Sequence, residues 1–315
     1  RDTLLSVDGY DEEFRCQDGY DIWLKVTAQY NVKNVNEPLF YYRQHGKNLT
    51  GNEEFLFQTR ASIMSKYVKR RGLEALDVLT VIPVRGGRAD PRSMPLRPLG
   101  DKLLIDWTID SALHAHHDMS VVVTTPDERV LDHVRERYGD RVLAHWRDPH
   151  LARINTSLEA TLSDMLEGYE AEHPPPDALM MLFIESPFRH AFYIDQAIFT
   201  MQIYEVDMVD AVRADSGTFY LHRGNGLEPL REEPGLRLER DDLYRRVGSM
   251  RLLRREHLRP RQGSSELRVG HILMDQQAAL TIRSEFDLEV AEMFAQREDV
   301  LPKPLLDQRR SLLPT

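Results

Sequence analysis

The stretch Val81-Ile82-Pro83-Val84-Arg85-Gly86-Gly87-Arg88-Ala89-Asp90-Pro91-Arg92 predicts the fold of this chain. It begins inside an apolar run, 78–82, that is typical of a buried strand, and it continues as a loop with two glycines and three arginines. A helical pattern follows over 104–113. Glycine lets a backbone approach an anion, and arginine presents a planar fork that matches phosphate oxygens. This order predicts a nucleotide-phosphate site, with a solvated basic turn as the alternative.

Composition limits the classes of protein that fit. The 315 residues are 41% hydrophobic and 29% charged, as in an ordinary soluble protein, and the net charge of −10 argues against a general nucleic-acid binder. Cys16 is the only cysteine, which excludes an intrachain disulfide and fits a cytoplasmic setting. No apolar run approaches the ~18 residues that span a bilayer. The chain begins at Arg1 in mid-pattern, so we expect a piece of a longer protein.

The region after residue 76 alternates strand and helix patterns. We expect strands over 78–83, 121–125, 142–144 and 180–184, and helices over 104–114, 129–138, 157–169 and 193–204. This alternation predicts an α/β fold with a mostly parallel sheet and helices on both faces. Ligands of such folds bind at the carboxyl ends of the strands.

The pattern breaks over 216–270, an arginine-rich, hairpin-like segment that indicates an inserted arm. Two strands, 271–274 and 279–282, and a helix, 285–296, are expected after it. We therefore expect a main domain over 77–300 and a loose tail over 301–315.

Residues 1–76 form a separate unit in this interpretation. Its patterns predict a helix over 21–28, short strands over 32–35 and 39–42, and a helix over 53–70. Arg70-Arg71-Gly72 is a typical helix end, with cations in the last turn and glycine just after it.

Several motifs in order resemble the acylneuraminate (CMP-sialic acid and related CMP-sugar) cytidylyltransferases over about 77–297. The matching segments are the loop 85–94, then 98–109, 121–127, 147–152, 185–189, 244–248 and 286–292. The resemblance implies a Rossmann-like, three-layer nucleotidyltransferase fold with a dimerisation arm, and hence a homodimer. It also implies a reaction of CTP with an acidic 2-keto sugar that gives a CMP-sugar and pyrophosphate.

The same resemblance implies roles for individual residues. Nucleotide contacts fall on Arg85, Gly86, Gly87, Arg147 and Ser186, and Arg88 and Arg92 would stabilise the leaving phosphates in place of the family's lysines. Contacts to the sugar fall on Arg189, Arg237 and Arg245. Each of these arginines, taken singly, could instead pair with one of the many surface carboxylates.

The sequence departs from the family at the metal positions and at the contact to the base. Mg²⁺ is expected for the family, but its two aspartate ligands are replaced by Thr281 and Arg283, which leaves a chain without a metal as the alternative. Phe183 stands where a glutamine would contact cytosine. The alternatives for function are therefore an inactive scaffold or dimerisation domain, or a nucleotide-sensing domain that keeps the pocket without the chemistry.

Residues 1–76 resemble the C-terminal third of a family-2, GT-A-type inverting glycosyltransferase, through the segments 9–24 and 38–50. The resemblance places Asp18 where the catalytic base would be. Capping of the following helix is the structural alternative for Asp18. A glycosyltransferase remnant joined to a CMP-sugar-synthetase-like domain would fit surface polysaccharide biosynthesis.

Overall fold

The computed structural model describes residues 1–14, 16–33, 35, 37, 39, 52–87, 90, 93–215, 217–230, 243–258 and 266–297. Arg88, Arg92, Arg237 and the tail 301–315 lie outside the described residues, and their predicted roles are not tested. No helix within the described ranges combines the length and the hydropathy of a bilayer-spanning segment.

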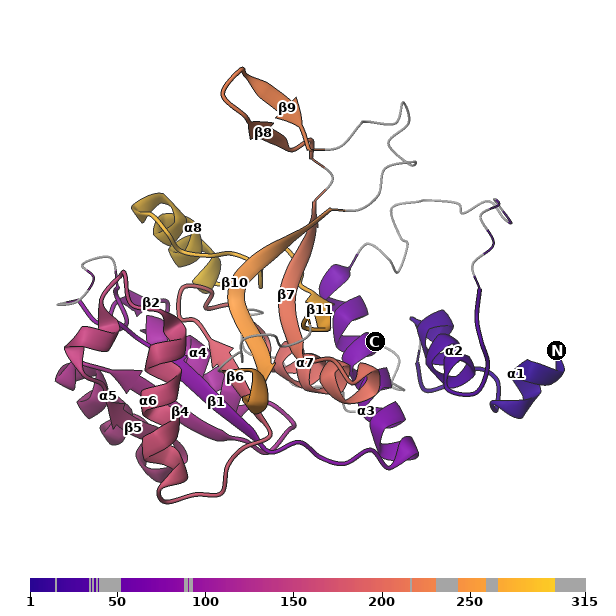
Figure 1. Ribbon diagram of the computed structural model, residues 1–315, viewed down its shortest axis with the longest axis horizontal. Helices are drawn as coiled ribbons and strands as arrows, with labels where there is room; N and C mark the ends of the chain where they lie inside the picture. The colour runs from indigo at the N-terminus through magenta and orange to yellow at the C-terminus, as the bar shows by residue number, and fades with distance from the viewer. Residues whose placement is uncertain are drawn as a thin grey trace.

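A seven-stranded sheet in the order β11-β7-β10-β6-β1-β4-β5 forms the centre of the protein (Figure 1). β10 runs antiparallel to its neighbours β6 and β7, and the remaining pairs are parallel, so the predicted mostly parallel sheet is confirmed. The strands are β1 (Val78–Pro83), β4 (Ser120–Thr125), β5 (Leu143–Trp146), β6 (Ala178–Leu182), β7 (Met208–Asp215), β10 (Leu243–Arg254) and β11 (Val269–Leu273).

Helices cover both faces of this sheet because successive side chains of each strand point to opposite sides. Leu79 and Val81 of β1 belong to a cluster with Leu162 of α6, whereas Val78 and Ile82 belong to a larger cluster with α4, α5 and α7. The three-layer arrangement is therefore confirmed. The helices are α4 (Leu104–Leu113), α5 (Glu128–Tyr138), α6 (Leu158–Glu170), α7 (Ala191–Tyr204) and α8 (Glu285–Ala295).

The N-terminal part packs against α7. Its helices are α1 (Asp2–Ser6), α2 (Asp18–Thr27) and α3 (Glu53–Arg71), and α3 ends at Gly72 in the left-handed conformation, as its sequence predicts. Leu24 of α2 and Met64 of α3 share a buried cluster with Phe199 of α7. Among the described residues of the runs 32–35 and 39–42, none belongs to a strand.

The described residues of the segment expected as an arm lie partly outside the sheet and partly within it. β8 (Tyr220–His222) and β9 (Leu227–Pro229) pair as a hairpin that projects from the sheet (Figure 1). β2 (Pro98–Leu99) and β3 (Lys102–Leu103) pair as a smaller hairpin that packs against α8 and buries Leu99. β10, by contrast, lies inside the sheet. This strand was not predicted from the sequence because its arginines mask the apolar pattern, although Val247, Met250 and Leu252 are buried.

The strand expected over 279–282 is wrong. The carboxylate of Asp275 accepts hydrogen bonds from the backbone N–H groups of Gln277 (2.7 Å) and Ala278 (2.9 Å), which turns the chain out of the sheet after β11. The Tyr193 hydroxyl holds that carboxylate by donating to Asp275 Oδ2 (2.6 Å). Further on, the N–H of Ile282 donates to the carbonyl of Glu185 (2.7 Å), which fixes this segment beside the end of β6.

We predict that Tyr193→Phe lowers the free energy of unfolding by about 1–3 kcal/mol, because it leaves the buried Asp275 carboxylate without this donor. Urea denaturation measures the change. Tyr10→Phe is the matched control, since Tyr10 is 60% exposed, and we expect a change within about 0.5 kcal/mol. Equal effects of the two substitutions would contradict the role given to the Tyr193 hydroxyl.

Candidate functional site: a basic cavity at the carboxyl ends of β1 and β6

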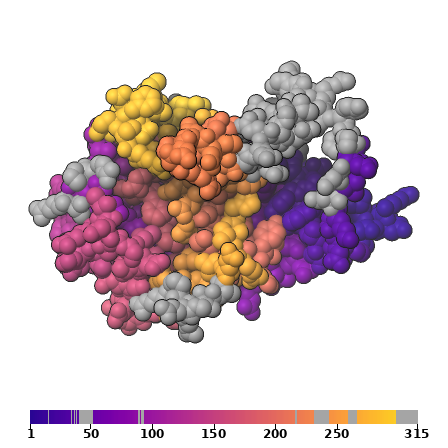
Figure 2. All heavy atoms as spheres, turned by 45° about the horizontal axis from the view of Figure 1, so that its top comes forward, coloured from indigo at the N-terminus to yellow at the C-terminus, as the bar shows by residue number. Residues whose placement is uncertain are grey.

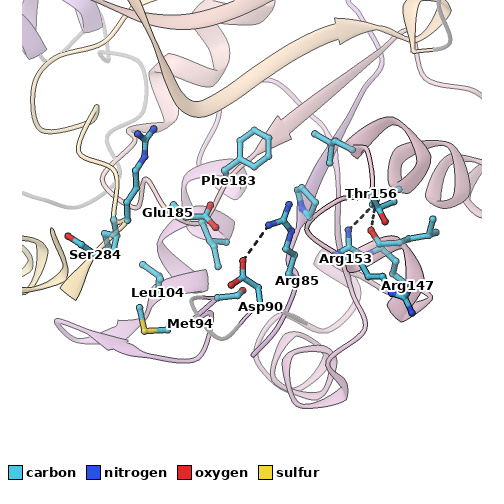
Figure 3. A pocket seen from close by; sticks show the side chains of 18 of the residues that line it. Arg85, Asp90, Met94, Leu104, Arg147, Arg153, Thr156, Phe183, Glu185 and Ser284 are labelled. Atoms are coloured by element: carbon cyan, nitrogen blue, oxygen red, sulfur yellow. Dashed lines mark hydrogen bonds and ion pairs between the residues drawn. The ribbon is translucent and has the colours of Figure 1, made fainter. Parts of the chain in front are cut away.

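A cavity of about 690 Å³ opens where β1 and β6 end. β1 lies between β4 and β6, and the chain leaves the ends of β1 and β6 through the loops that carry Arg85 and Glu185 (Figure 3). Arg283 and Ser284, which precede α8, complete the lining. This place is the crevice at a change of strand order, where open α/β sheets bind ligands.

The backbone of the glycine-rich loop packs closely against Asp127 at its first glycine, Gly86. Gly86 has a φ of +76°, and a Cβ added there would lie 2.7 Å from Cβ of Asp127. Asp127 caps α5 by accepting a hydrogen bond from the N–H of Arg129. A Cβ added at Gly87 would have no neighbour nearer than 3.9 Å, so only the first glycine is required by the packing.

Arginines dominate the charge of the cavity. Arg85, Arg147, Arg153 and Arg283 line it, against the carboxylates of Asp90, Glu185 and Glu285. Arg85 lies 3.4 Å from Oδ2 of the buried Asp90 within the same loop. The described lining therefore has one more positive than negative charge when every group is ionised, which favours an anionic ligand.

Arg147 is buried and held in one orientation. Its Nη2 donates to the carbonyl of Val84 (2.6 Å) and its Nη1 to Oγ1 of Thr161 (3.3 Å). Burial, and secondly the charge of Arg85, lower the pKa of the Arg147 guanidinium to about 10, so it remains protonated at neutral pH. Its buried Nε has no partner among the described residues.

The sequence did not identify Asp90, Arg153 or Glu185 as residues of the site. The side chain of Glu185 is open to the cavity, yet the surrounding protein desolvates its carboxylate and raises the pKa of Glu185, while the charges of Arg85 and Arg189 act in the opposite direction. The one available signal was its place in the segment 185–189, directly after a buried strand.

A second cavity, of about 390 Å³, adjoins the first. Phe183, Glu185 and Arg283 line both cavities, and Leu158 does so from α6. Arg246 and Arg251 of β10 contribute positive charge to the second cavity, where Asp210 pairs with Arg251 (2.8 Å).

Thr281 and Arg283, the positions to which the resemblance assigns metal ligands, do not fit Mg²⁺. Thr281 Oγ1 lies 3.0 Å from Oγ of Ser186 and also bonds to the carbonyl of Ala279, while Arg283 is a cation. Mg²⁺ needs hard oxygen ligands, usually carboxylates. Over the described ranges, no group of three or more histidine, cysteine, aspartate or glutamate side chains is arranged to hold a metal ion.

The other predicted site residues lie away from both cavities. Ser186 is fully buried, and Arg189 is 1% exposed and donates to the carbonyl of Ser249 (2.8 Å), so Arg189 connects the end of β6 to β10. Arg245 is exposed beside Asp215 (3.8 Å) and lines neither cavity, whereas the adjacent Arg246 lines the second.

Asp18 is exposed in the first turn of α2 and lines neither cavity. It is not the helix cap either, because the N-cap residue is Gln17, which has a φ of 59°. A carboxylate in the first turn still interacts favourably with the helix dipole.

The fold is an α/β nucleotidyltransferase fold that solved cytidylyltransferases share. One solved structure with this fold is 4-diphosphocytidyl-2C-methyl-D-erythritol synthase from Anaerococcus prevotii, with 13% identity, a TM-score of 0.52, and coverage of 70% of this chain and 97% of that one. Another is CMP:2-keto-3-deoxy-manno-octonic acid synthetase complexed with CTP, with 17% identity, a TM-score of 0.50, and coverage of 70% and 99%.

At these identities the likeness concerns the fold. No protein-family model matches the chain, and no curated protein matches it by sequence. Neither similar structure is named as a glycosyltransferase, so the interpretation of residues 1–76 stays a prediction.

We predict that Gly86→Ala lowers the free energy of unfolding by at least roughly 1–2 kcal/mol, because it adds left-handed strain and a contact with Asp127. Gly87→Ala is the matched control and should change it by less than about 0.5 kcal/mol. Urea denaturation of both variants makes the comparison. The packing argument fails if Gly86→Ala is as stable as Gly87→Ala.

Proposed function

We propose that this chain binds a cytidine nucleotide in the first cavity and an acidic 2-keto sugar in the second. The observation that carries the proposal is the set of arginines around a cavity at the carboxyl ends of β1 and β6. Guanidinium groups pair with phosphate and carboxylate oxygens through two parallel hydrogen bonds. The CTP complex of a protein with this fold supports the choice of nucleotide.

The phosphates are assigned to the side of the first cavity that holds Arg85, Arg147 and Arg153. Arg147 is already fixed by its bonds to Val84 and Thr161, so little side-chain entropy is lost when an anion binds it. Phe183 offers an aromatic face to a base but no hydrogen-bonding edge. Selectivity for cytosine must therefore come from other groups, and UTP is a useful competitor.

The sugar is assigned to the second cavity because Arg246 and Arg251 line it and because it adjoins the first. A nucleotide and a sugar in the two cavities would meet at Glu185 and Arg283, which line both. The same arrangement would accommodate a CMP-linked sugar. A parent protein with an active glycosyltransferase part would place this binding in surface polysaccharide biosynthesis.

We infer that the site binds the nucleotide and the sugar without catalysing nucleotidyl transfer between them. In the synthetase reaction, the sugar's anomeric hydroxyl would attack the α-phosphorus, lose its proton and displace pyrophosphate. In this proposal Arg283 stands in for the family's charge clamp, and the Asp287 carboxylate, which accepts a hydrogen bond from the Arg283 backbone N–H (2.9 Å), lies beside it. A guanidinium compensates the charge of bound phosphates but accepts no oxygen ligands, so it supports binding more than turnover.

Calorimetric titration with CTP, in EDTA and then in Mg²⁺, tests this function. We expect saturable CTP binding in EDTA that Mg²⁺ does not strengthen, and no pyrophosphate release when an acidic 2-keto sugar is added. Arg283→Gln should weaken CTP binding at least tenfold, about 1.4 kcal/mol. Arg135→Gln is the matched control, because Arg135 is an exposed arginine of α5 that lines neither cavity.

Different results of the same titration favour other functions. Mg²⁺-dependent binding with pyrophosphate release would identify a synthetase, and absence of nucleotide binding would identify a scaffold. Thr281→Asp combined with Arg283→Asp should create Mg²⁺-dependent CTP binding if the rest of the pocket is intact.

A second proposal concerns the β8–β9 hairpin, which we propose as a homodimer contact. Large apolar side chains are exposed on and beside it: Phe219, Tyr220, Leu221, Leu227 and Leu230. Figure 2 shows the hairpin, in orange, at the surface. Isolated two-stranded hairpins are only marginally stable in water, and exposed apolar clusters commonly mark protein interfaces.

Light scattering after size-exclusion chromatography tests the contact. We expect a dimer for the unmodified chain and a monomer for Tyr220→Ser combined with Leu227→Ser, with an unchanged melting temperature. Leu5→Ser combined with Tyr10→Ser is the control, since both residues are comparably exposed on the N-terminal part. A monomeric unmodified chain at all concentrations contradicts the proposal.

A further inference from the structure

A third cavity, of about 430 Å³, lies between the N-terminal helices and the sheet domain. Its walls come from α2 and α3 on one side and from α7 and β11 on the other. It shares no lining residue with the two cavities described above. Its volume falls within the range of small-molecule sites, and its position between two parts of a protein is typical of them.

Aromatic rings form one wall of this cavity. Trp23 stacks on Tyr20 with ring centroids 6.1 Å apart and an interplanar angle of 14°, and it lies 6.3 Å from the ring of Tyr204. Trp23 is nevertheless 43% exposed. The hydroxyls of Tyr20 and Tyr204 lie 3.2 Å apart. The wall therefore offers apolar ring faces bordered by hydroxyl groups, which suits a ligand that has both an apolar face and polar edges.

The cavity has one permanent charge, on Arg60. Its guanidinium lies 4.9 Å from the centroid of the Tyr20 ring and donates to Oε1 of Gln17 (3.1 Å), a neutral acceptor. Among the described residues that line the cavity, none carries a carboxylate. Burial, and secondly the charge of Arg60, lower the pKa of His271, so this lining imidazole is neutral at neutral pH. The charge of Arg60 thus remains uncompensated and favours one anionic group on a ligand.

Gln196 supplies an independent indication of a ligand. It is 3% exposed and lines the cavity from α7, and its side-chain Oε1 has no hydrogen-bond partner among the described residues. Buried polar atoms are nearly always paired, with protein groups, water or a ligand. A hydroxyl group on a bound molecule would provide the missing donor.

We propose that this cavity binds a sugar acid, a pyranose ring that carries a carboxylate. The apolar face of the ring would stack on Trp23, the carboxylate would pair with Arg60, and a ring hydroxyl would donate to Gln196. A single guanidinium matches the single charge of a carboxylate. This site is separate from the proposed nucleotide and sugar cavities, and a ligand in it would contact both parts of the chain.

Titrations with galacturonate and galactose, followed by tryptophan fluorescence, test the proposal on the full chain. The two sugars share a ring and differ in the carboxylate. We expect a low-millimolar Kd for galacturonate, as small ligands of this size commonly give, and at least tenfold weaker binding of galactose. Arg60→Gln should weaken galacturonate binding at least tenfold and abolish the preference over galactose. Trp23→Ala should weaken the binding of both sugars. Binding to this variant is measured by ligand NMR, because the substitution removes the tryptophan whose fluorescence reports on the cavity.

Matched variants separate binding at this cavity from general effects of removing a charge or a ring. Arg141→Gln removes another surface guanidinium beside a tyrosine, and Trp146→Ala removes another exposed tryptophan, and neither should change the Kd. Gln196→Met should weaken binding while the melting temperature stays equal or rises, because no protein bond to Oε1 is lost. If Arg60→Gln fails to fold, Arg60→Lys should still bind galacturonate more weakly than the unmodified chain.

Four results would overturn the proposal. They are no saturable signal with galacturonate up to about 20 mM, equal affinity for the two sugars, tight binding of benzoate in place of galacturonate, and a loss of binding in Arg246→Gln but not in Arg60→Gln. The last result would assign the sugar acid to the second cavity. It would therefore support that part of the proposed function while contradicting this site.

Discussion

The parallel pairing of β1 with both β4 and β6 is the constraint on which the rest of the structure depends. Val81 pairs with Val122 on one side and with Met181 on the other, so the carboxyl ends of the three strands meet at one edge of the sheet. Connections from this edge lead to helices that cover the faces, and the crevice lies where the strand order changes. The arginines gather at this edge because the loops that carry them leave the strands there.

Buried arginines stabilise this edge from within. Arg147 ties the loop after β5 to the carbonyl of Val84, and Arg189 ties the loop after β6 to the carbonyl of Ser249. Burial lowers the pKa of Arg189 to about 9, yet its charge persists at neutral pH. The free-energy cost of desolvating these two guanidinium groups is offset in part by the hydrogen bonds with which they fix the two loops. Arg189 lines neither cavity, whereas Arg147 lines the first cavity together with Arg85, whose side chain is 41% exposed and pairs with Asp90 (3.4 Å). Position in the fold therefore separates arginines that the sequence pattern alone does not distinguish.

The regular elements were predictable because their side chains follow simple periods. The apolar run of β1 and the apolar stripe of α5 specify element type without tertiary information. β10 was missed because charged side chains occupy the exposed positions of a strand that is buried only in its second half. The segment 279–282 has the composition of a strand, but the carboxylate of Asp275 takes its chain into a turn.

The sequence predicted the location of the candidate site but not the set of residues that line it. A position after a buried strand locates Arg85 and Gly86 at the carboxyl edge. The path of each loop decides which neighbouring side chains reach the cavity. Sequence patterns do not specify that path. Glu185 opens into the cavity while Ser186, one residue later, is fully buried. The third cavity was not foreseeable either, because Trp23, Arg60 and Gln196 come from three helices that only the packing brings together.

In the proposed function, Arg283 would perform only one of two tasks that a metal ion performs together. A divalent cation neutralises phosphate charge and also coordinates several oxygens at once, which orients them for displacement. The guanidinium of Arg283 retains the first property through a planar set of donors, but it cannot draw protein and phosphate oxygens into one coordination sphere. Arg283 would therefore support the binding of phosphates without supplying the geometry for their transfer.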